Sequence, residues 1–180
     1  CYHVPNEKTR SLLCQLTNKR IEVISYWYND KLWYPIDKTK ARKELGLPIN
    51  DYYVGSFQRD TEGSDLKTPK LEKGPDLFCD YLIRNRSKIE CTNKLHMIRL
   101  LYAACDLYVV SSRFEGGPQA IIEAAAMEVP IISTDVGIAS TVLSDNCILN
   151  IKNDYYCPND SDVNYALNKV QSLVIKSHGQ

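Results

Sequence analysis

The sequence predicts an α/β domain built on a parallel β-sheet, and two features of the chain predict it. Short apolar segments alternate with segments of helical character, and the connections between them are short. The expected strands at Asp106–Ser112 and Val129–Asp135 contain the apolar runs LYVV and VPII, which do not alternate with polar residues, and this is typical of strands covered by helices on both sides. We therefore expect a doubly wound parallel sheet with helices on both faces.

The elements follow one another in a regular order. The first half of the chain predicts an extended segment at Arg20–Tyr28, a short helix at Lys38–Leu45 that Gly46 ends, and a short strand at Tyr52–Phe57. The second half predicts helices at about 75–87, 94–104 and 118–128, the two strands already named, a weak strand near 148–151 and a last helix from about 161. Residues 1–20 are expected to be the tail end of a preceding domain or a linker, and residues 21–180 the domain itself.

Composition limits the class of protein. The 180 residues are 44% hydrophobic and 24% charged, which suffices for one domain with a sizeable core or for one domain and a short piece of another. A formal net charge of zero disfavours nucleic acid as a partner. Because the chain begins with Cys1 and not with methionine, we expect it to be a fragment of a longer protein.

Cysteine use and hydropathy suggest the compartment. None of the seven cysteines forms a Cys-x-x-Cys pair, and Cys79 and Cys105 have apolar neighbours, which favours a reduced cytoplasmic chain over a disulfide framework or a zinc site. No apolar run approaches the ~20 residues that a membrane span needs, and no signal peptide opens the chain. Membrane association of a longer parent protein is left open.

Three loops with polar residues or glycine follow the expected strands, at residues 58–73, 111–117 and 135–140. In a doubly wound sheet, ligands bind at the edge where strands end and helices begin. The middle loop leads through Gly116 and Gly117 into a helix whose first N–H groups attract anions. Pro118 is expected to be the first helical residue, so that Gln119 and Ala120 are the candidate N–H donors to a diphosphate.

Two carboxylates belong to the same stretch. Glu115 precedes the glycine turn, and Glu123 follows eight residues later, about two helical turns along roughly the same edge. A carboxylate has two oxygens that suit a vicinal diol such as ribose. On the residues alone a plainer interpretation is favoured: Glu115 interacts with the helix dipole, Glu123 is solvated, and a glycine turn before a helix is common.

The stretch resembles a known family. The sequence EGGPQAIIE fits the E-x7-E pattern of retaining glycosyltransferases of the GT-B fold, the glycosyl transferases group 1 type, and DLYVVSSRFEGGPQAIIEAAAMEVPIISTDVG is similar to their nucleotide-sugar-binding domain. GSFQRD followed by KGPDLF looks like the phosphate loop of the same family. The resemblance extends over about residues 21–142 and is closest at 101–137. It implies the C-terminal, Rossmann-like half of a hexosyltransferase-type enzyme, which holds a nucleotide-diphosphate sugar.

The resemblance also implies roles for individual residues. Arg59 and Lys73 match the basic pair that neutralises the diphosphate as it leaves, a form of charge stabilisation that often dominates catalysis. Glu115 matches the acid that orients the donor sugar, and Glu123 the acid that binds the ribose. Gly116 and Gly117 match the backbone that packs against the sugar. The family needs no metal and no cofactor besides the nucleotide-sugar substrate.

The sequence departs from the family in three places. The loop from Arg59 is longer than usual, which leaves Lys70 and Lys73 as alternatives for the phosphate ligand. The stretch between Glu90 and Lys94 is shorter than in the family, which leaves two alternatives: an abridged sheet, or a natural protein of which a part is missing here. In the family this region contacts the nucleotide base, so UDP, GDP and ADP all stay open. Ile138 stands where many relatives carry a second glycine.

An acceptor-binding N-terminal domain is absent from the chain, so we expect the fragment to bind a nucleotide sugar weakly and to transfer nothing alone. The alternative function is a non-catalytic nucleotide- or sugar-binding module of the same fold. A sugar-nucleotide epimerase is disfavoured, because its carboxylates and histidine have no clear counterparts.

His3, His96 and His178 are scattered and are expected to be structural or exposed. Asp160–Asp162 resembles a metal-binding pair of another glycosyltransferase fold, but its place before a helix favours N-capping.

Overall fold

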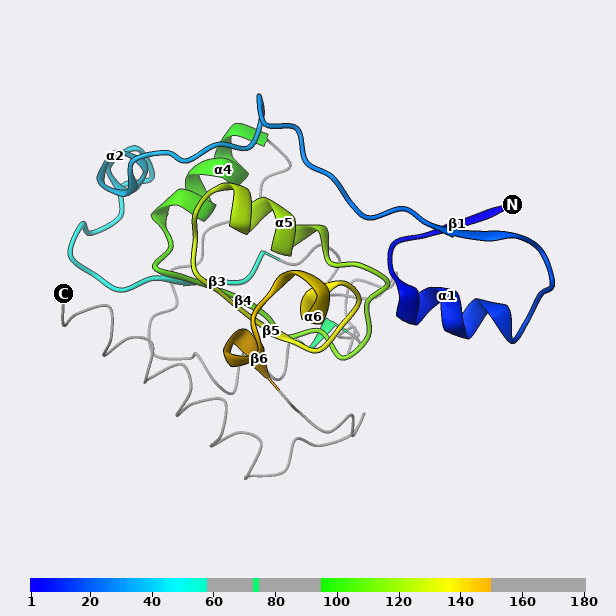
Figure 1. Ribbon diagram of the computed structural model, residues 1–180. Coiled ribbons are helices and arrows are strands. Elements are labelled where there is room, and N and C mark those ends of the chain that lie inside the picture. The colour runs from blue at the N-terminus through cyan, green and yellow to red at the C-terminus, as the bar shows by residue number, and fades with distance from the viewer. Residues whose placement is uncertain (58–72, 75–94, 150–180) are drawn as a thin grey trace, which may run out of the picture.

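The computed structural model describes residues 1–57, 73–74 and 95–149, which form two separate parallel sheets. The smaller sheet pairs β1 (Tyr2–Val4) with β2 (Ile21–Val23), and α1 (Glu7–Cys14) connects them. In Figure 1 this β-α-β unit stands apart from the larger body, and an extended segment leads from it towards α2 (Lys38–Glu44).

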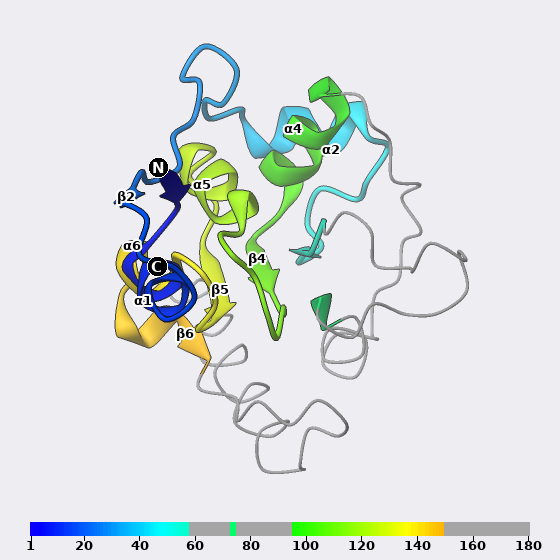
Figure 2. The same cartoon turned by 90° about the vertical axis from the view of Figure 1, so that its right-hand side faces the viewer.

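The larger sheet has four parallel strands in the order β3-β4-β5-β6. They are β3 (Val54–Gly55), β4 (Leu107–Val110), β5 (Ile131–Thr134) and β6 (Ile148–Leu149), and β4 to β6 lie side by side in Figure 2. Every residue of β4 and β5 is buried. The apolar sequence of β4 indicates this burial, whereas β5 buries two polar residues, Ser133 and Thr134, behind its apolar first half. The predicted parallel-sheet α/β fold is confirmed, with strands shorter than expected.

Helices in the connections cover the sheet. Both α4 (Leu95–Ala104) and α5 (Gln119–Ala126) lie on the same side of it in Figure 1, and α2 packs against α4. The short helix α6 (Ala139–Val142) and a 3-10 turn at Asp145–Cys147 lead from β5 to β6. Buried side chains of these helices and strands pack into one hydrophobic core. Its most buried residues include Tyr102, Tyr108, Ile121, Ala124 and Ala139.

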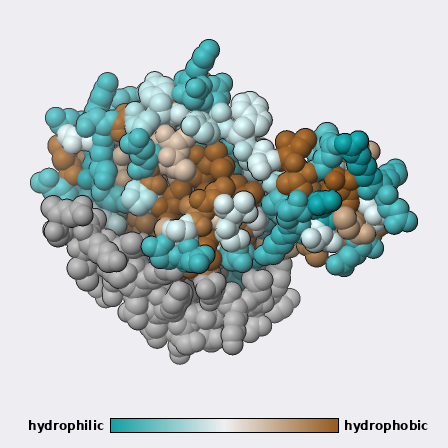
Figure 3. Space-filling model, in the orientation of Figure 1, coloured by the Kyte–Doolittle hydropathy of each residue, from teal (hydrophilic) through white to brown (hydrophobic). Residues whose placement is uncertain are grey.

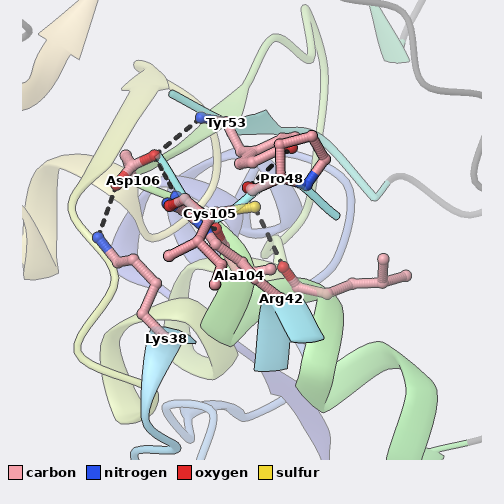
Figure 4. A network of polar contacts seen from close by, with 9 residues as sticks. Lys38, Arg42, Pro48, Tyr53, Ala104, Cys105 and Asp106 are labelled. Atoms are coloured by element: carbon pink, nitrogen blue, oxygen red, sulfur yellow. Dashed lines mark hydrogen bonds and ion pairs between the residues drawn. The ribbon is translucent and has the colours of Figure 1, made fainter. Parts of the chain in front are cut away.

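A polar network fastens α2 to the amino end of the sheet (Figure 4). Arg42 is 5% exposed, and its guanidinium donates to Asp106 and to the backbone oxygens of Ala104 and Ile49. The carboxylate of Asp106 also accepts from Lys38 Nζ at 2.7 Å and from the backbone N–H of Tyr53 at 2.8 Å. These bonds fix the helix pair and the beginning of β4 as one unit.

One predicted element differs in the structure, and several others lie outside the described residues. The extended segment at Arg20–Tyr28 contains only a three-residue strand, which pairs with Tyr2–Val4 in the small sheet and not with the four-stranded one. The predicted helices at 75–87 and from 161, the short stretch between Glu90 and Lys94, and Asp160–Asp162 lie outside the described residues. Within the described ranges, the longest helices are too short to cross a membrane.

Candidate functional site

The loops that follow β4 and β5 meet at the carboxyl edge of the sheet. Gly137 has a φ of +53°, which favours glycine, and a Cβ placed there would lie 2.8 Å from the Cα of Gly117 and from the Cδ of Pro118. Gly116 beside them is exposed, with open space around it. The expected convergence of residues 111–117 and 135–140 is thus confirmed, and it depends on a glycine in each loop.

The beginning of α5 differs from the expectation in one detail. Pro118 is the N-cap, with φ −71° and ψ 101°, so the first helical residue is Gln119, and the prediction that Pro118 begins the helix was wrong. The proline ring fixes φ in a range that both positions share, and ψ distinguishes them. No side chain caps the helix, and the N–H groups of Gln119 and Ala120 have no acceptor among the described residues.

Lys73 and Glu115 form an ion pair beside this helix end. Lys73 Nζ lies 2.7 Å from Glu115 Oε1, and the two side chains are 27% and 17% exposed. Ser112 Oγ donates to the same oxygen at 3.0 Å, while Ser111 Oγ donates to the backbone oxygen of Gly74 at 2.9 Å and so holds the lysine's segment against the end of β4. Glu115 Oε2 has no partner within the described part of the chain.

Glu123 is anchored from the core. It is half-buried on α5, and its Oε2 accepts from the Tyr102 hydroxyl at 3.0 Å. Burial raises the pKa of the Glu123 carboxyl above its usual 4.5, and the Tyr102 hydrogen bond lowers it again in part. Its other oxygen, Oε1, has no hydrogen-bond or ion-pair partner among the described residues.

A cluster of aromatic side chains connects Glu123 with the backbone just after β3. The Tyr102 and Tyr108 rings lie 4.9 Å apart, and the Tyr108 hydroxyl accepts from the backbone N–H of Phe57 at 3.0 Å. Burial is the largest of the effects that raise the pKa of both tyrosines, so both stay protonated. Phe57 directly precedes the predicted phosphate loop, so the cluster connects Glu123 with the strand that leads into that loop.

Asn6 belongs to the site although sequence reasoning missed it. It is 6% exposed, its Nδ2 donates to the backbone oxygen of Gly116 at 2.7 Å, and its Oδ1 caps α1 by accepting from the Thr9 N–H at 2.8 Å. An asparagine before a helix is a recognisable N-cap signal. Its contact with a turn 110 residues away has no signal in the sequence.

The structure thus brings some of the predicted residues together and leaves others untested. Lys73, Glu115, Gly116, Gly117, Gln119 and Ala120 surround the turn between β4 and α5. Glu123 lies further along α5, with Tyr102 as its partner. Arg59 and Lys70 lie outside the described residues. The buried Ile138 is 3% exposed and takes part in the core.

Titratable groups elsewhere form other clusters. Cys1, His3 and Glu22 of the small sheet have potential ligand atoms within 4.8 Å of one another, and Glu22 also pairs with Arg20. His96 pairs with Glu44 at 2.8 Å on the surface. His3 and His96 are exposed, as expected, and His178 lies outside the described ranges.

Comparison with known proteins identifies the family. The profile of the family described as "Glycosyl transferases group 1" matches residues 63–174, more than half of the chain. The chain belongs to the glycosyl transferases group 1 family. Its fold is that of GT-B proteins, in agreement with the solved structures that it resembles.

One curated relative and two solved structures are similar to this chain. It is 33% identical over 129 residues to TuaC of Bacillus subtilis, whose name assigns it to glycosyl transfer in teichuronic acid biosynthesis; the match covers 64% of this chain and 33% of TuaC. Sucrose-phosphate synthase from Thermosynechococcus elongatus gives a TM-score of 0.71 at 20% identity, over 96% of this chain and 48% of that one. HepE from Anabaena, solved in complex with UDP-glucose, gives 0.67 at 19% identity, over 98% and 54%.

The chain therefore spans about a third of the length of TuaC and about half of the length of the two solved proteins. At identities below 25%, the two structural likenesses show the fold alone.

Proposed function

We propose that this chain is the donor-binding part of a glycosyltransferase, which holds a nucleotide-diphosphate sugar so that its glycosyl group passes to an acceptor with retention of configuration. The observation that carries the proposal is the Lys73–Glu115 ion pair beside the uncapped beginning of α5. A cation and free helical N–H groups together form an anion site, and a carboxylate next to them accepts from sugar hydroxyls.

Each residue has a definite task in this proposal. The diphosphate lies at the N–H groups of Gln119 and Ala120, with Lys73 and Arg59 neutralising the charge that develops as it leaves. Glu115 orients the donor sugar through Oε2, and Gly116 and Gly117 allow the sugar to approach the backbone.

The nucleoside half lies further along α5. Glu123 Oε1 accepts from the ribose hydroxyls while Oε2 remains on Tyr102. No step in this scheme requires a metal ion. The name of a structural relative refers to a UDP-glucose complex, which supports a nucleotide sugar as the ligand class.

Calorimetric titration with UDP, GDP and ADP tests the donor site. Lys73→Ala and Arg59→Ala should each weaken diphosphate binding by about tenfold or more, since charge-assisted hydrogen bonds contribute roughly 1.5–3 kcal/mol. Glu123→Ala should weaken binding of the nucleotide and leave inorganic pyrophosphate binding unchanged. Lys70→Ala tests the alternative lysine: if Lys73 is the phosphate ligand it should change binding little, and a loss of binding in Lys70→Ala but not in Lys73→Ala would assign the phosphate to Lys70. Unchanged binding in the Lys73, Arg59 and Glu123 variants would reject the site.

A transfer assay separates the enzyme from a non-catalytic module of the same fold. The 180-residue chain is expected to bind without transferring, because it spans about half of the length of its structural neighbours. In a protein that joins this chain to an acceptor-binding domain, Glu115→Gln should abolish glycosyl transfer while nucleotide binding persists. A longer protein that binds donors and never transfers would favour the module.

A further inference from the structure

A cavity of about 360 Å³ opens beside the candidate donor site, in the segment that leads from the small sheet to α2. Its lining consists of Tyr26, Trp27, Tyr28, Asn29, Trp33 and Gln119. The volume lies within the roughly 300–1,000 Å³ typical of small-molecule sites. On the face shown in Figure 3, hydrophobic residues also gather in the middle of the larger body, with hydrophilic residues above them.

The aromatic side chains of this cavity are unusually accessible. Trp27 is 76% exposed and Tyr28 is 47% exposed, whereas large aromatic groups ordinarily bury most of their surface. Trp33, half-buried, packs edge-on against Tyr102 at 5.7 Å between ring centroids. The cavity thus has an aromatic floor, Trp33, that packs against the core, and exposed rings at its outer side.

Two amides supply unused polar groups. Asn29 Oδ1 accepts from the Lys31 N–H at 3.0 Å, which leaves its Nδ2 as a donor without a partner among the described residues. Gln119 Nε2 donates to the backbone oxygen of Trp27 at 3.3 Å, and its Oε1 has no hydrogen-bond donor among the described residues. Flat apolar rings with one donor and one acceptor suit a pyranose, which has apolar C–H faces and hydroxyls at its rim.

The cavity is continuous with the glycine turn. Tyr26 lies directly against Gly117, where a Cβ would fall within 2.9 Å of three atoms of its ring. Gln119 belongs both to the cavity and to the first turn of α5. A ligand in the cavity would therefore lie next to a donor sugar held at Gly116 and Gly117.

We propose that this aromatic cavity binds a hexopyranose ring of the acceptor, and this inference rests on the donor site proposed above. Trp27 and Tyr28 stack on the sugar ring, and Asn29 and Gln119 bind its hydroxyls. The substrate class is thus an acceptor that ends in a hexose, such as a growing glycan. The acceptor contacts arise from the donor half of the protein as well as from any other domain.

The test uses the tryptophans themselves, because the chain has only Trp27 and Trp33 and both line the cavity. Their emission is followed while methyl α-glucopyranoside, methyl α-mannopyranoside or methyl β-galactopyranoside is added, with the acyclic polyol mannitol as the control ligand. At least one glycoside should give a saturable change, and mannitol should give none.

Variants locate the response. Tyr28→Ala should weaken glycoside binding roughly tenfold, as loss of a stacked ring implies. Tyr34→Ala is the matched control, because Tyr34 is also 47% exposed but does not line the cavity. Its ring centroid lies 4.1 Å from Arg99 Cζ. Asn29→Asp retains the acceptor for the Lys31 N–H, removes the amide donor and should weaken binding a few-fold.

The outcomes distinguish this inference from the proposed function. Saturable glycoside binding that Tyr28→Ala weakens and Tyr34→Ala does not supports the cavity. UDP binding without a saturable response to any glycoside, or an equal loss in both tyrosine variants, overturns the cavity and leaves the donor site intact. Emission that depends on protein concentration and not on glycoside means that a second copy fills the cavity, which also overturns the proposal.

Discussion

Two ion pairs occupy opposite ends of β4, and they differ in how completely their groups are satisfied. At the amino end, Asp106 accepts from Arg42, Lys38 and the Tyr53 N–H, and both ends of the Arg42 fork are bonded (Figure 4). At the carboxyl end, Glu115 uses one oxygen for Lys73 and Ser112, and its second oxygen has no partner among the described residues.

The difference separates structure from function. Buried charges are tolerated when their hydrogen bonds are complete, so the network of Asp106 is suited to holding α2 and α4 on the sheet. Charges with unused bonding capacity beside an uncapped helix are suited to a polar ligand. Similar charged pairs thus serve packing at one end of a strand and, in our proposal, binding at the other.

The largest expected effect is on stability at the amino end. Asp106→Ala leaves the buried Arg42 guanidinium without its counter-charge and should cost about 3–5 kcal/mol in the free energy of unfolding. Lys73→Met removes one partner of the other pair and should cost less than about 1 kcal/mol, because both side chains remain partly accessible. Urea unfolding followed by circular dichroism measures both. Equal midpoints for the two variants would contradict the comparison.

A pair of glycines gives the next effect. Gly46 and Gly137 both have positive φ, +68° and +53°, but a Cβ at Gly46 meets no atom within 4 Å. Gly46→Ala should therefore cost only the backbone strain, about 1–2 kcal/mol. Gly137→Ala adds a collision with the backbone of Gly117 and should cost more.

The two glycine variants should also differ in their affinity for UDP. The collision at Gly137 displaces the turn before α5, so Gly137→Ala should weaken UDP binding in calorimetry, whereas Gly46→Ala should leave the affinity of the folded protein unchanged. Identical affinities in both variants would mean that the turn between β4 and α5 does not contribute to the site.

The comparison also shows what the sequence could reveal. The apolar runs Leu107–Val110 and Val129–Ile132 do not alternate with polar residues, which reflects burial on both faces and is a local property, and they predicted the parallel sheet correctly. The short helix Lys38–Glu44 was predicted to within one residue, because Asp37 caps it and Gly46 follows its end.

Contacts between distant residues had no such local sign. Lys73 and Glu115 are 42 residues apart. The strand pattern predicted that their loops share one edge of the sheet, but only the family resemblance singled out these two side chains. Asn6 and Gly116 are 110 residues apart, and nothing in the spacing connects them. The ψ of Pro118, which makes it a cap, was not fixed by the proline ring, which restricts φ alone.

The smallest expected effect concerns the pH dependence at Glu123. Because burial raises its pKa in the folded state, the carboxyl retains its proton to a higher pH in the fold than in the unfolded chain. That proton stabilises the fold at low pH, and the stabilisation is lost as the pH rises from the usual 4.5 through the raised pKa. Glu123→Gln should remove this component of the pH dependence.

Binding should change in the opposite direction over the same interval. The ionised carboxylate is the stronger acceptor for ribose hydroxyls, so affinity for a nucleotide sugar, whose diphosphate diester does not titrate there, should rise as Glu123 loses its proton. Parallel measurements of urea midpoint and calorimetric affinity between about pH 4 and 7 cover the titration of such a carboxyl. If affinity in the wild type and in Glu123→Gln follows pH identically, Glu123 does not bind the ligand. If affinity rises and stability falls with increasing pH in the wild type but not in Glu123→Gln, then the half-buried Glu123 carboxylate both destabilises the fold when ionised and binds the nucleotide.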